Sequence, residues 1–509
     1  METKTAAIEM RNITKRFGQV LANDKVWLNI YRGEILALLG ENGSGKTTLM
    51  NMLSGIYFPD EGEIKIDGKE VVIRSPKDAF DNGIGMIHQH FKLVDVLTAA
   101  ENIVLGLPGK LDLKAASAKI REICDKYGFS VDPAQKIYDM SVSQKQTVEI
   151  VKVLYRGADI LILDEPTAVL TPQETDKLFA VLRNMRNDGK AIVIITHKMH
   201  EVEALSDRVA ILRHGQFIGD MLTAHTNAQE MTNMMVGHAV SLNIERPDPV
   251  DPKPRIEVKG LTVRSVDGIV KLDDVSFTAN SGEILGIAGI SGCGQKELLE
   301  AIAGLQTVES GSISYIEDDG SREELIGKDP LSIAELGVSL SFVPEDRLGM
   351  GLVGNMNLAD NMMLRSFRRG KSIFTDRRSP RALAESVVQE LSVSTPSVDT
   401  PVRRLSGGNV QKVLVGREIA SAPTVLLTAY AVRGLDIHSS YTIYDLINRQ
   451  KKAGVAVIFV GEDLDVLLEL CDRILVLCGG KVSGIVSGHG AEKREVGMMM
   501  TKLGGQSHE

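Results

Sequence analysis

The stretch GEILALLGENGSGKTTL, from Gly33 to Leu49, decides the fold class of this chain. The apolar residues before Gly40 are typical of a buried strand. The GxxxxGK[ST] pattern from Gly40 to Thr47 comes next and opens a helix. Its glycines let backbone N–H groups turn inward on phosphate oxygens at the positive end of that helix. A strand, a glycine-rich loop and a helix in this order predict an α/β domain that binds phosphate.

Side chains in and beyond this loop carry the predicted chemistry. Lys46 would neutralise the β- and γ-phosphates of a nucleotide, and Thr47 would ligate Mg²⁺. The later strand ILIL delivers Asp164 and Glu165 at its end. Asp164 would hold Mg²⁺, and Glu165 would orient or deprotonate the attacking water. The predicted phosphate-binding residues are Gly40, Glu41, Asn42, Gly43, Ser44, Gly45, Lys46, Thr47 and Thr48.

The chain repeats itself once. The stretch GEILGIAGISGCGQKEL begins at Gly282, 249 residues after Gly33. Two further pairs match at an offset of 265: DMSVSQKQTVEI with RLSGGNVQKVLV, and LSDRVAIL with LCDRILVL. A repeat of this length is a duplicated domain rather than a solenoid unit. Each half alternates apolar strands with amphipathic helical stretches, which predicts a mainly parallel sheet in each.

Prolines mark the join between the halves. The segment IERPDPVDPKPRIEV, Ile244 to Val258, holds four of them and favours a stiff extended linker. We therefore expect a first domain over residues 1–243, a linker over 244–255 and a second domain over 256–509. The stretches Thr98–Arg156 and Leu358–Ala420 look largely helical, and each would form a subdomain of its half.

Bulk properties exclude several classes of protein. The net charge of −9 and the pI of about 5.7 argue against a nucleic-acid binder. The four cysteines form no CxxC pair, which is typical of free thiols in a reducing cytosol. The N-terminal residues lack the apolar core of a signal peptide. No apolar run approaches the ~18–20 residues that cross a bilayer. We expect any membrane role to depend on a partner chain.

The motifs together resemble those of ABC ATPases over nearly the whole chain. The resemblance rests on LILDEPTAVLTPQE, on LSGGNVQK and on the duplicated P-loop region. It implies two tandem P-loop NTPase cassettes, each with a mainly parallel sheet, an antiparallel β edge and a helical subdomain. It also implies ATP and Mg²⁺ as cofactors. Phe17 in KRFG would stack on adenine, Gln89 in MIHQHF would link Mg²⁺ to the membrane partner, and His197 in IITHK would contact the γ-phosphate.

The second half has lost this chemistry. The residues at the positions of Lys46, Thr47, Phe17, Gln89, Asp164, Glu165 and His197 are, in the same order, Gln295, Lys296, Val266, Glu345, Ala429, Tyr430 and Glu462. These changes remove charge neutralisation, both metal ligands, the base and the γ-phosphate contact. We expect this site to hold no Mg²⁺, because a lysine ammonium in the metal slot repels the ion.

One motif is kept only in the second half. Leu405-Ser-Gly-Gly-Asn409, here called the signature loop, matches the family pattern, whereas the first half reads Met140-Ser-Val-Ser-Gln144. In the family each ATP lies between the P-loop of one cassette and the signature loop of the other. The resemblance thus implies one competent site, completed by Ser406, Gly407, Gly408 and Asn409. Asp436 could reach across to this competent site. The residue at the position of Asp436 in the first half is Thr171.

The resemblance implies an ATPase that energises a membrane importer of nucleosides or sugars. Its partners would be two transmembrane permease subunits and an extracytoplasmic substrate-binding protein, with this chain peripheral on the cytoplasmic face of the membrane. The segment His88–Leu93 departs from the HQEL of sugar importers and favours nucleosides. The alternative is a soluble tandem-cassette ATPase acting on the ribosome, which usually has two competent sites and a long charged linker. A non-enzymatic scaffold would not need Lys46 and Glu165.

Overall fold

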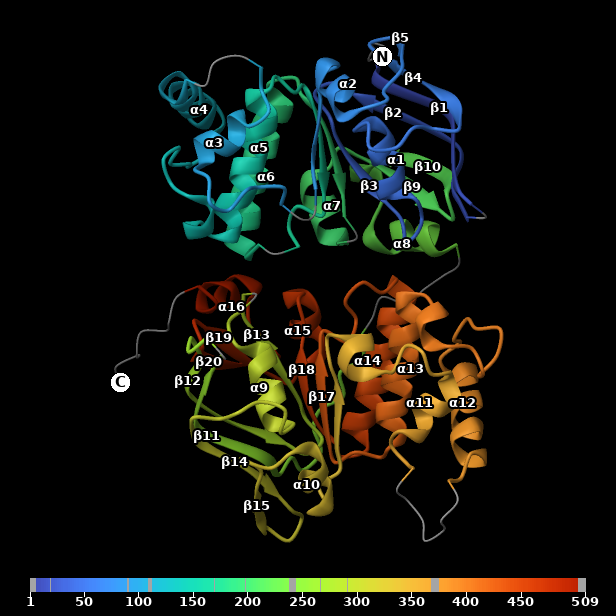
Figure 1. The fold of residues 1–509 in the computed structure, drawn as a ribbon, viewed down its shortest axis with the longest axis vertical. Helices are drawn as coiled ribbons and strands as arrows, with labels where there is room; N and C mark the ends of the chain where they lie inside the picture. Colours follow the sequence, from blue (N-terminus) through green and yellow to red (C-terminus); the bar gives the residue numbers. More distant parts are fainter. Residues whose placement is uncertain are drawn as a thin grey trace. The chain divides into compact units, whose positions relative to one another are not determined.

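The computed structural model describes residues 6–18, 20–88, 91–108, 112–168, 170–196, 198–237, 244–265, 267–290, 292–367 and 375–501. The chain divides into two compact units, Met1–Ser241 and Leu242–Glu509, which are taken one at a time (Figure 1). Among the described helices, none combines the length and apolar character that a membrane span requires.

A six-stranded sheet in the order β10-β9-β3-β8-β7-β6 forms the centre of the first unit. All its pairings are parallel except that of β9 with the edge strand β10. Every residue of β3, β7 and β8 is buried, as expected for parallel strands covered on both faces. The strands are β3 (Ile35–Leu39), β6 (Ile84–Ile87), β7 (Ile160–Asp164), β8 (Ala191–Ile195), β9 (Arg208–Arg213) and β10 (Gln216–Leu222).

A second, antiparallel sheet has the order β2-β1-β4-β5. Its strands are β1 (Ala6–Phe17), β2 (Val20–Tyr31), β4 (Glu61–Ile66) and β5 (Lys69–Val71). Apolar residues of this sheet share one core with the six-stranded sheet and with α1 (Lys46–Leu53), so both sheets support the helix that follows the P-loop. The other helices beside these sheets are α2 (Pro76–Asp81), α6 (Pro172–Asn187), α7 (Met199–Leu205) and α8 (Ala228–Val236).

The expected helical subdomain of the first unit is present, with its own small core. It consists of α3 (Ala99–Val104), α4 (Leu113–Tyr127) and α5 (Val142–Tyr155), side by side in Figure 1. Helix α3 begins at a capping box of Thr98 and Glu101, and α5 begins at one of Ser141 and Gln144. These caps explain where the helices start.

The second unit repeats this architecture. Its sheets have the orders β16-β17-β18-β13-β19-β20 and β12-β11-β14-β15. The strands are β11 (Pro254–Arg264), β12 (Val270–Asn280), β13 (Ile284–Ala288), β14 (Ser310–Ile316), β15 (Arg322–Glu324), β16 (Leu340–Val343), β17 (Val425–Ala429), β18 (Ala456–Val460), β19 (Arg473–Cys478) and β20 (Lys481–Ser487). The helices are α9 (Gln295–Ile302), α10 (Pro330–Glu335), α11 (Leu358–Met363), α12 (Arg378–Glu390), α13 (Gly407–Ala420), α14 (Ile437–Lys452), α15 (Leu464–Leu470) and α16 (Lys493–Met499).

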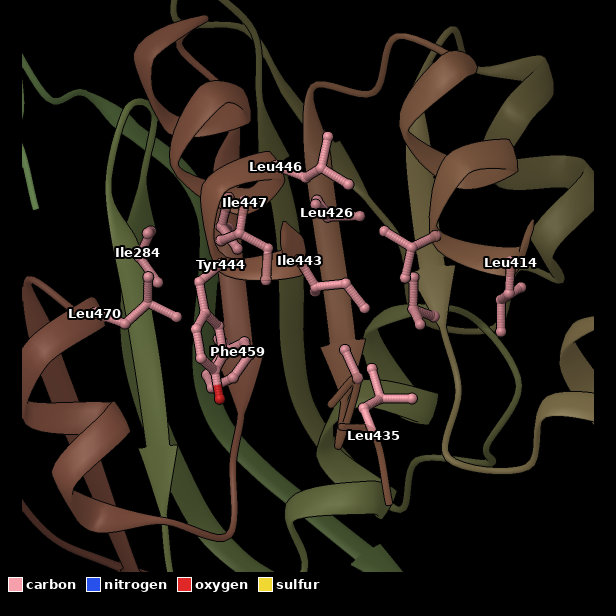
Figure 2. Close-up of a cluster of buried hydrophobic side chains, with 14 of the residues drawn as sticks. Ile284, Leu414, Leu426, Leu435, Ile443, Tyr444, Leu446, Ile447, Phe459 and Leu470 are labelled. Atoms are coloured by element: carbon pink, nitrogen blue, oxygen red, sulfur yellow. The ribbon is translucent and has the colours of Figure 1, made fainter. Parts of the chain in front are cut away.

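Helix α14 covers one face of this second six-stranded sheet. Figure 2 shows Ile443 and Tyr444 of α14 beside Leu426 of β17 and Phe459 of β18. The rings of Tyr444 and Phe459 meet edge to face, with centroids 6.5 Å apart. This core supports the carboxyl ends of β17 and β18, where the counterparts of the predicted catalytic residues lie.

The proline-rich segment is anchored on the second unit. Ile244 is buried in the core of that unit. Arg246 Nη1 donates hydrogen bonds to the carbonyl oxygens of Leu468, at 2.6 Å, and Cys471, at 2.9 Å. Asn448 Nδ2 donates to the carbonyl oxygen of Glu245 at 2.6 Å. The first residues of the expected linker, from Ile244 to Arg246, are therefore packed on and hydrogen-bonded to the second unit.

Candidate functional site

The P-loop of the first unit has the expected strand–loop–helix setting between β3 and α1. Gly45 has φ 94° and precedes the first residue of the helix. A Cβ at Gly45 would lie 2.3 Å from the carbonyl oxygen of Ala22, so no other residue fits without a shift of the backbone. The loop is thus shaped by close backbone approach.

Lys46 lies folded over the loop. Its side chain is buried, and Nζ donates hydrogen bonds to the carbonyl oxygens of Gly40, at 2.7 Å, and Glu41, at 2.9 Å. Burial lowers the pKa of this ammonium, while the nearby carboxylates of Glu165 and Asp164 act in the opposite direction. An ammonium held by two carbonyl groups at a helix N-terminus is placed to move onto phosphate oxygens.

Thr47 and Asp164 meet although they are distant in sequence. Thr47 Oγ1 donates a hydrogen bond to Asp164 Oδ2 at 3.4 Å. Burial raises the pKa of Asp164 to about 6, and the charge of Glu165 adds to this effect. A hydroxyl beside a carboxylate is a pair of hard-oxygen donors that suits Mg²⁺. No cluster of three or more His, Cys, Asp or Glu ligands occurs among the described residues.

Glu165 lies at the turn after β7. Its backbone has φ 47°, in the left-handed region that is uncommon for a residue with a side chain. Its N–H donates to the carbonyl oxygen of Ile195 at 2.8 Å, which ties this turn to the end of β8. Such a turn sets the direction of the carboxylate beside Asp164.

An aromatic pair lies at the end of β1. Phe17 is 42% exposed, and its ring meets that of Tyr57 edge to face, with centroids 5.1 Å apart. Lys15 Nζ lies 5.6 Å from the centroid of Phe17 on the same surface. Tyr57 was not predicted from the sequence; its signal would have been an exposed aromatic residue shortly after the P-loop helix. The exposed faces of this pair offer a platform for a planar base.

The signature loop of the second unit begins α13. Ser406 Oγ caps this helix and accepts hydrogen bonds from Asn409 N, at 3.5 Å, and Asn409 Nδ2, at 2.8 Å. A Cβ at Gly408 would lie 3.8 Å from Asp436 Oδ2 and 3.7 Å from Leu435 Cδ2, which are ordinary contacts. Asp436 in turn caps α14 through Ser439 N at 2.7 Å. The signature loop and Asp436 are therefore neighbours within one unit.

Three of the predicted positions cannot be placed. Gln89, His197 and Val266 lie outside the described residues. Their roles stay predictions.

Comparison with known proteins agrees with this geometry. The family model described as ABC transporter matches residues 23–168 and again residues 272–428. These two matches contain both P-loop regions, the β7 carboxylates and the signature loop.

The chain belongs to the ABC transporter family.

The similarity to known relatives and solved structures covers nearly the whole length of the chain. The nucleoside import ATP-binding protein NupA of Lactococcus lactis subsp. cremoris is 42% identical, over 99% of each chain. The glucose import ATP-binding protein TsgD13 of Haloferax volcanii is 39% identical, over 98% of this chain and 96% of the relative. An archaeal ribosome recycling factor, solved with a ribosomal stalk protein, shares the fold at a TM-score of 0.60 and 16% identity, over 91% of this chain and 87% of that one. The chain is thus an ATP-binding subunit of the import type, a P-loop ATPase with two cassettes.

The second cassette has the ABC fold but lacks the residues expected to carry its chemistry. Gln295, at the position of Lys46, is 3% exposed, and its Nε2 donates to the carbonyl oxygen of Ile290 at 3.3 Å. Lys296 is 53% exposed, and Nζ lies 3.7 Å from Glu300 Oε1 one turn along α9. The ammonium thus lies beside a carboxylate of its own helix, and the expectation that it occupies the metal position stays a prediction. The absence of both metal ligands is a separate reason to expect no Mg²⁺.

Tyr430 takes the place of Glu165, the predicted base. It keeps the left-handed backbone of Glu165, with φ 52°, and its N–H donates to the carbonyl oxygen of Val460 at 2.9 Å. Burial raises the pKa of its phenol to about 12, with a further contribution from Glu345. The turn is thus preserved, while a group that stays protonated at neutral pH replaces the carboxylate.

Proposed function

We propose that ATP is hydrolysed at one composite site per chain, formed by the P-loop of the first cassette and the signature loop of the second. The nucleotide would contact Phe17, the loop Gly40–Thr48 and Asp164 on one side. On the other side it would contact the residues Ser406–Asn409. This proposal gives each half of the chain one necessary part of the same site.

The observation that carries the proposal is the glycine pair of the signature loop. Neither Gly407 nor Gly408 has a positive φ, and a Cβ at Gly408 meets only ordinary contacts. The first cassette builds the equivalent helix start with Val142 and Ser143, through an intact capping box. The fold of a cassette therefore does not require glycine here. Bare backbone at a helix N-terminus suits close approach to a phosphate supplied from outside the unit.

The residues of the first cassette have separate tasks in this site. Lys46 would exchange its two carbonyl partners for β- and γ-phosphate oxygens. Thr47 and Asp164, with Gln89, would hold Mg²⁺, which neutralises charge that develops on the phosphates. Glu165 would accept the proton of the attacking water or orient it. His197 would contact the γ-phosphate and the signature loop would donate N–H groups from the far side, so that charge is stabilised from two directions.

A matched pair of substitutions tests the composite site. Gly408→Asp places a bulky anion where the phosphate should approach and should lower the ATPase rate of the assembled transporter by about 10²–10³-fold. Ser143→Asp makes the corresponding change in the other cassette and should leave the rate within about twofold. Equal losses, or a larger loss from Ser143→Asp, would show that the two sites are not divided in this way.

Each cassette also has a surface suited to a permease. In the second cassette a hollow of about 460 Å³ is lined by residues that include Glu345, Leu348 and Val410. Exposed apolar side chains of that region are Leu348, Met350, Val353 and Met356; those of the corresponding region in the first cassette are Val94, Val96, Leu105 and Leu107. Exposed apolar groups gathered in one region mark contact surfaces. Their different composition suits two permease chains that are not identical, with this subunit peripheral on the cytoplasmic face of the membrane.

Purification with the permeases tests this arrangement. The complex should contain one copy of this chain for each pair of permease chains, and an extracytoplasmic binding protein should stimulate its ATPase activity. A stable complex with ribosomes in place of permeases would contradict the proposed role in a membrane importer. The likeness to the ribosome recycling factor extends to the fold alone, since the identity is 16%.

Nucleosides are the proposed cargo. The segment around Gln89 departs from the sugar-importer pattern, and a relative named for nucleoside import is 42% identical. ATPase activity of the assembled transporter should rise when the binding protein is loaded with a nucleoside. Stimulation by glucose or ribose, with no response to nucleosides, would assign the chain to a sugar importer.

A further inference from the structure

Three residues of the degenerate site converge on one arginine in the second cassette. Arg433 Nη1 forms an ion pair with Glu345, and its Nε lies 2.9 Å from Glu462 Oε1. Its guanidinium carbon is 5.9 Å from the ring centroid of Tyr430. Glu345, Glu462 and Tyr430 stand at the positions of Gln89, His197 and Glu165. Positions proposed to serve the nucleotide in the first cassette are thus joined through Arg433 in the second.

A second arginine extends this cluster to the signature loop. Arg347 Nη1 donates a hydrogen bond to the carbonyl oxygen of Gly407 at 3.2 Å, and its Nη2 donates to the carbonyl oxygen of Arg433. Arg347 follows Glu345 by two residues, so one segment holds both ends of the cluster. The same segment lines the hollow proposed for the permease, together with Leu405 and Gly407. A planar guanidinium with five N–H donors suits this bridging between separate acceptors.

The cluster belongs to the second cassette alone. The residue at the position of Arg433 in the first cassette is Ala168, and the residue at the position of Arg347 is Phe91. Neither side chain can form an ion pair or donate a hydrogen bond. The cluster is therefore tied to the cassette that has lost its own chemistry and kept its signature loop.

We infer that Arg433 and Arg347 brace the signature loop and the Asp436 segment of the second cassette without any nucleotide in that cassette's own site. The inference rests on the proposed function, because the braced loop is the one that completes the composite site. Both arginines are positioning residues, because they act on hydrolysis through the backbone and not by touching ATP. One point of action is Gly407 in the signature loop. The other is Arg433 itself, three residues before Asp436. Exposed ion pairs are individually weak, so the effect comes from the network that joins three segments.

Preorganisation is the physical reason for such a brace. Donors that stabilise transition-state charge are effective only if they need no reorganisation during the reaction. A displacement of about 1 Å at such a position can reduce a rate by about 10²-fold. A braced loop would also transmit a shift of the permease-facing segment to the signature loop, because Arg347 belongs to that segment and donates to the carbonyl oxygen of Gly407.

The test measures ATP turnover of the assembled transporter. Arg347→Ala should lower kcat about tenfold, with KM for ATP changed by less than about twofold, since the P-loop cassette is untouched. Arg347→Lys, which keeps the charge and can reach one acceptor, should recover part of that loss. Arg433→Gln should act in the same direction as Arg347→Ala. Arg381→Ala removes a surface arginine paired with Asp399 on the same subdomain and should change neither constant.

The outcomes separate the inference from the proposed function. If Gly408→Asp is inactive while Arg347→Ala and Arg433→Gln both retain normal kcat, the brace is refuted and the composite site stands. If Gly408→Asp is itself active, the composite site fails. If Arg347→Ala does not fold, the kcat and KM of Arg433→Gln decide the matter. A rise in KM with unchanged kcat would also overturn the inference, because it would place these residues in nucleotide binding.

Discussion

Thr47 Oγ1 lies 3.4 Å from Asp164 Oδ2, although 117 residues separate the two in the chain. The contact joins the first turn of α1 to the end of β7 and brings a hydroxyl and a carboxylate to the place where a metal ion is expected. Asp164 is buried, and its pKa is raised to about 6. The free protein therefore holds a carboxylate that is costly to ionise.

Replacing Asp164 by Asn should stabilise the nucleotide-free protein above pH 6. The native state binds this proton more tightly than the unfolded state, so stability falls as pH rises from about 4 to about 6. A shift from 3.8 to about 6 corresponds to at most about 3 kcal/mol. In thermal unfolding without Mg²⁺, Asp164→Asn should melt at a higher temperature than the unchanged protein at pH 8. Near pH 4 the two melting temperatures should be the same. Asp60→Asn is the control, because Lys15 and Arg16 lower the pKa of Asp60 and its removal should give no gain.

Lys46→Ala and Gln295→Ala should differ sharply in activity. The first removes the ammonium that neutralises phosphate charge and should lower the ATPase rate by about 10²–10³-fold. The second removes a side chain whose Nε2 is turned to the carbonyl oxygen of Ile290. It should cost about 1 kcal/mol of stability and leave turnover near normal. Comparable losses of turnover in the two variants would show that the second P-loop takes part in hydrolysis.

Phe17→Ala and Tyr57→Ala should each weaken ATP binding. Stacking of a base on an aromatic ring contributes about 1–3 kcal/mol, so KM for ATP should rise about 5–100-fold while kcat changes little. The control is Trp27→Ala, since Trp27 is an exposed aromatic residue whose Nε1 is bonded to Asn12 and not to the pair. If the KM of Tyr57→Ala for ATP were unchanged, Phe17 and not Tyr57 would be the residue that contacts adenine.

Arg246→Ala should destabilise the second cassette alone. It removes the hydrogen bonds that Nη1 donates to the carbonyl oxygens of Leu468 and Cys471. Loss of a charged donor to buried acceptors costs about 1–3 kcal/mol. Hydrogen exchange should rise in α15 and β19 with α1 and β7 unaffected. Lys253→Ala, at an exposed ion pair with Asp251, should leave exchange unchanged in both cassettes.

Much of the fold follows from local patterns in the sequence. The apolar strands before Gly40 and Asp164 are buried parallel strands because both faces of the sheet are covered by helices or the second sheet. In the described parts of the stretches Thr98–Arg156 and Leu358–Ala420, the structure has three α-helices each. The alignment of the halves also identified Gln295 and Tyr430 as replacements for chemical groups. These features are set by a few neighbouring residues, because glycine spacing fixes the shape of a loop and apolar periodicity fixes the buried face of a strand or helix.

Side-chain destinations required the tertiary structure. The sequence predicts Lys296 at the metal position, and only the structure shows its ammonium beside the carboxylate of Glu300, one helical turn away. The sequence shows an aromatic residue, Tyr57, shortly after the P-loop helix, but only the fold brings its ring to Phe17.

The sequence by itself determined the duplication, the complete P-loop with its carboxylates, and the loss of both in the second half. Only the tertiary structure decided that residues 244–246 pack on the second cassette, and that Arg433 and Arg347 join Glu345, Glu462 and Gly407. The physical reason is that motifs express backbone geometry over a few residues, whereas ion pairs and packing depend on which distant segments the fold brings within 4 Å of each other.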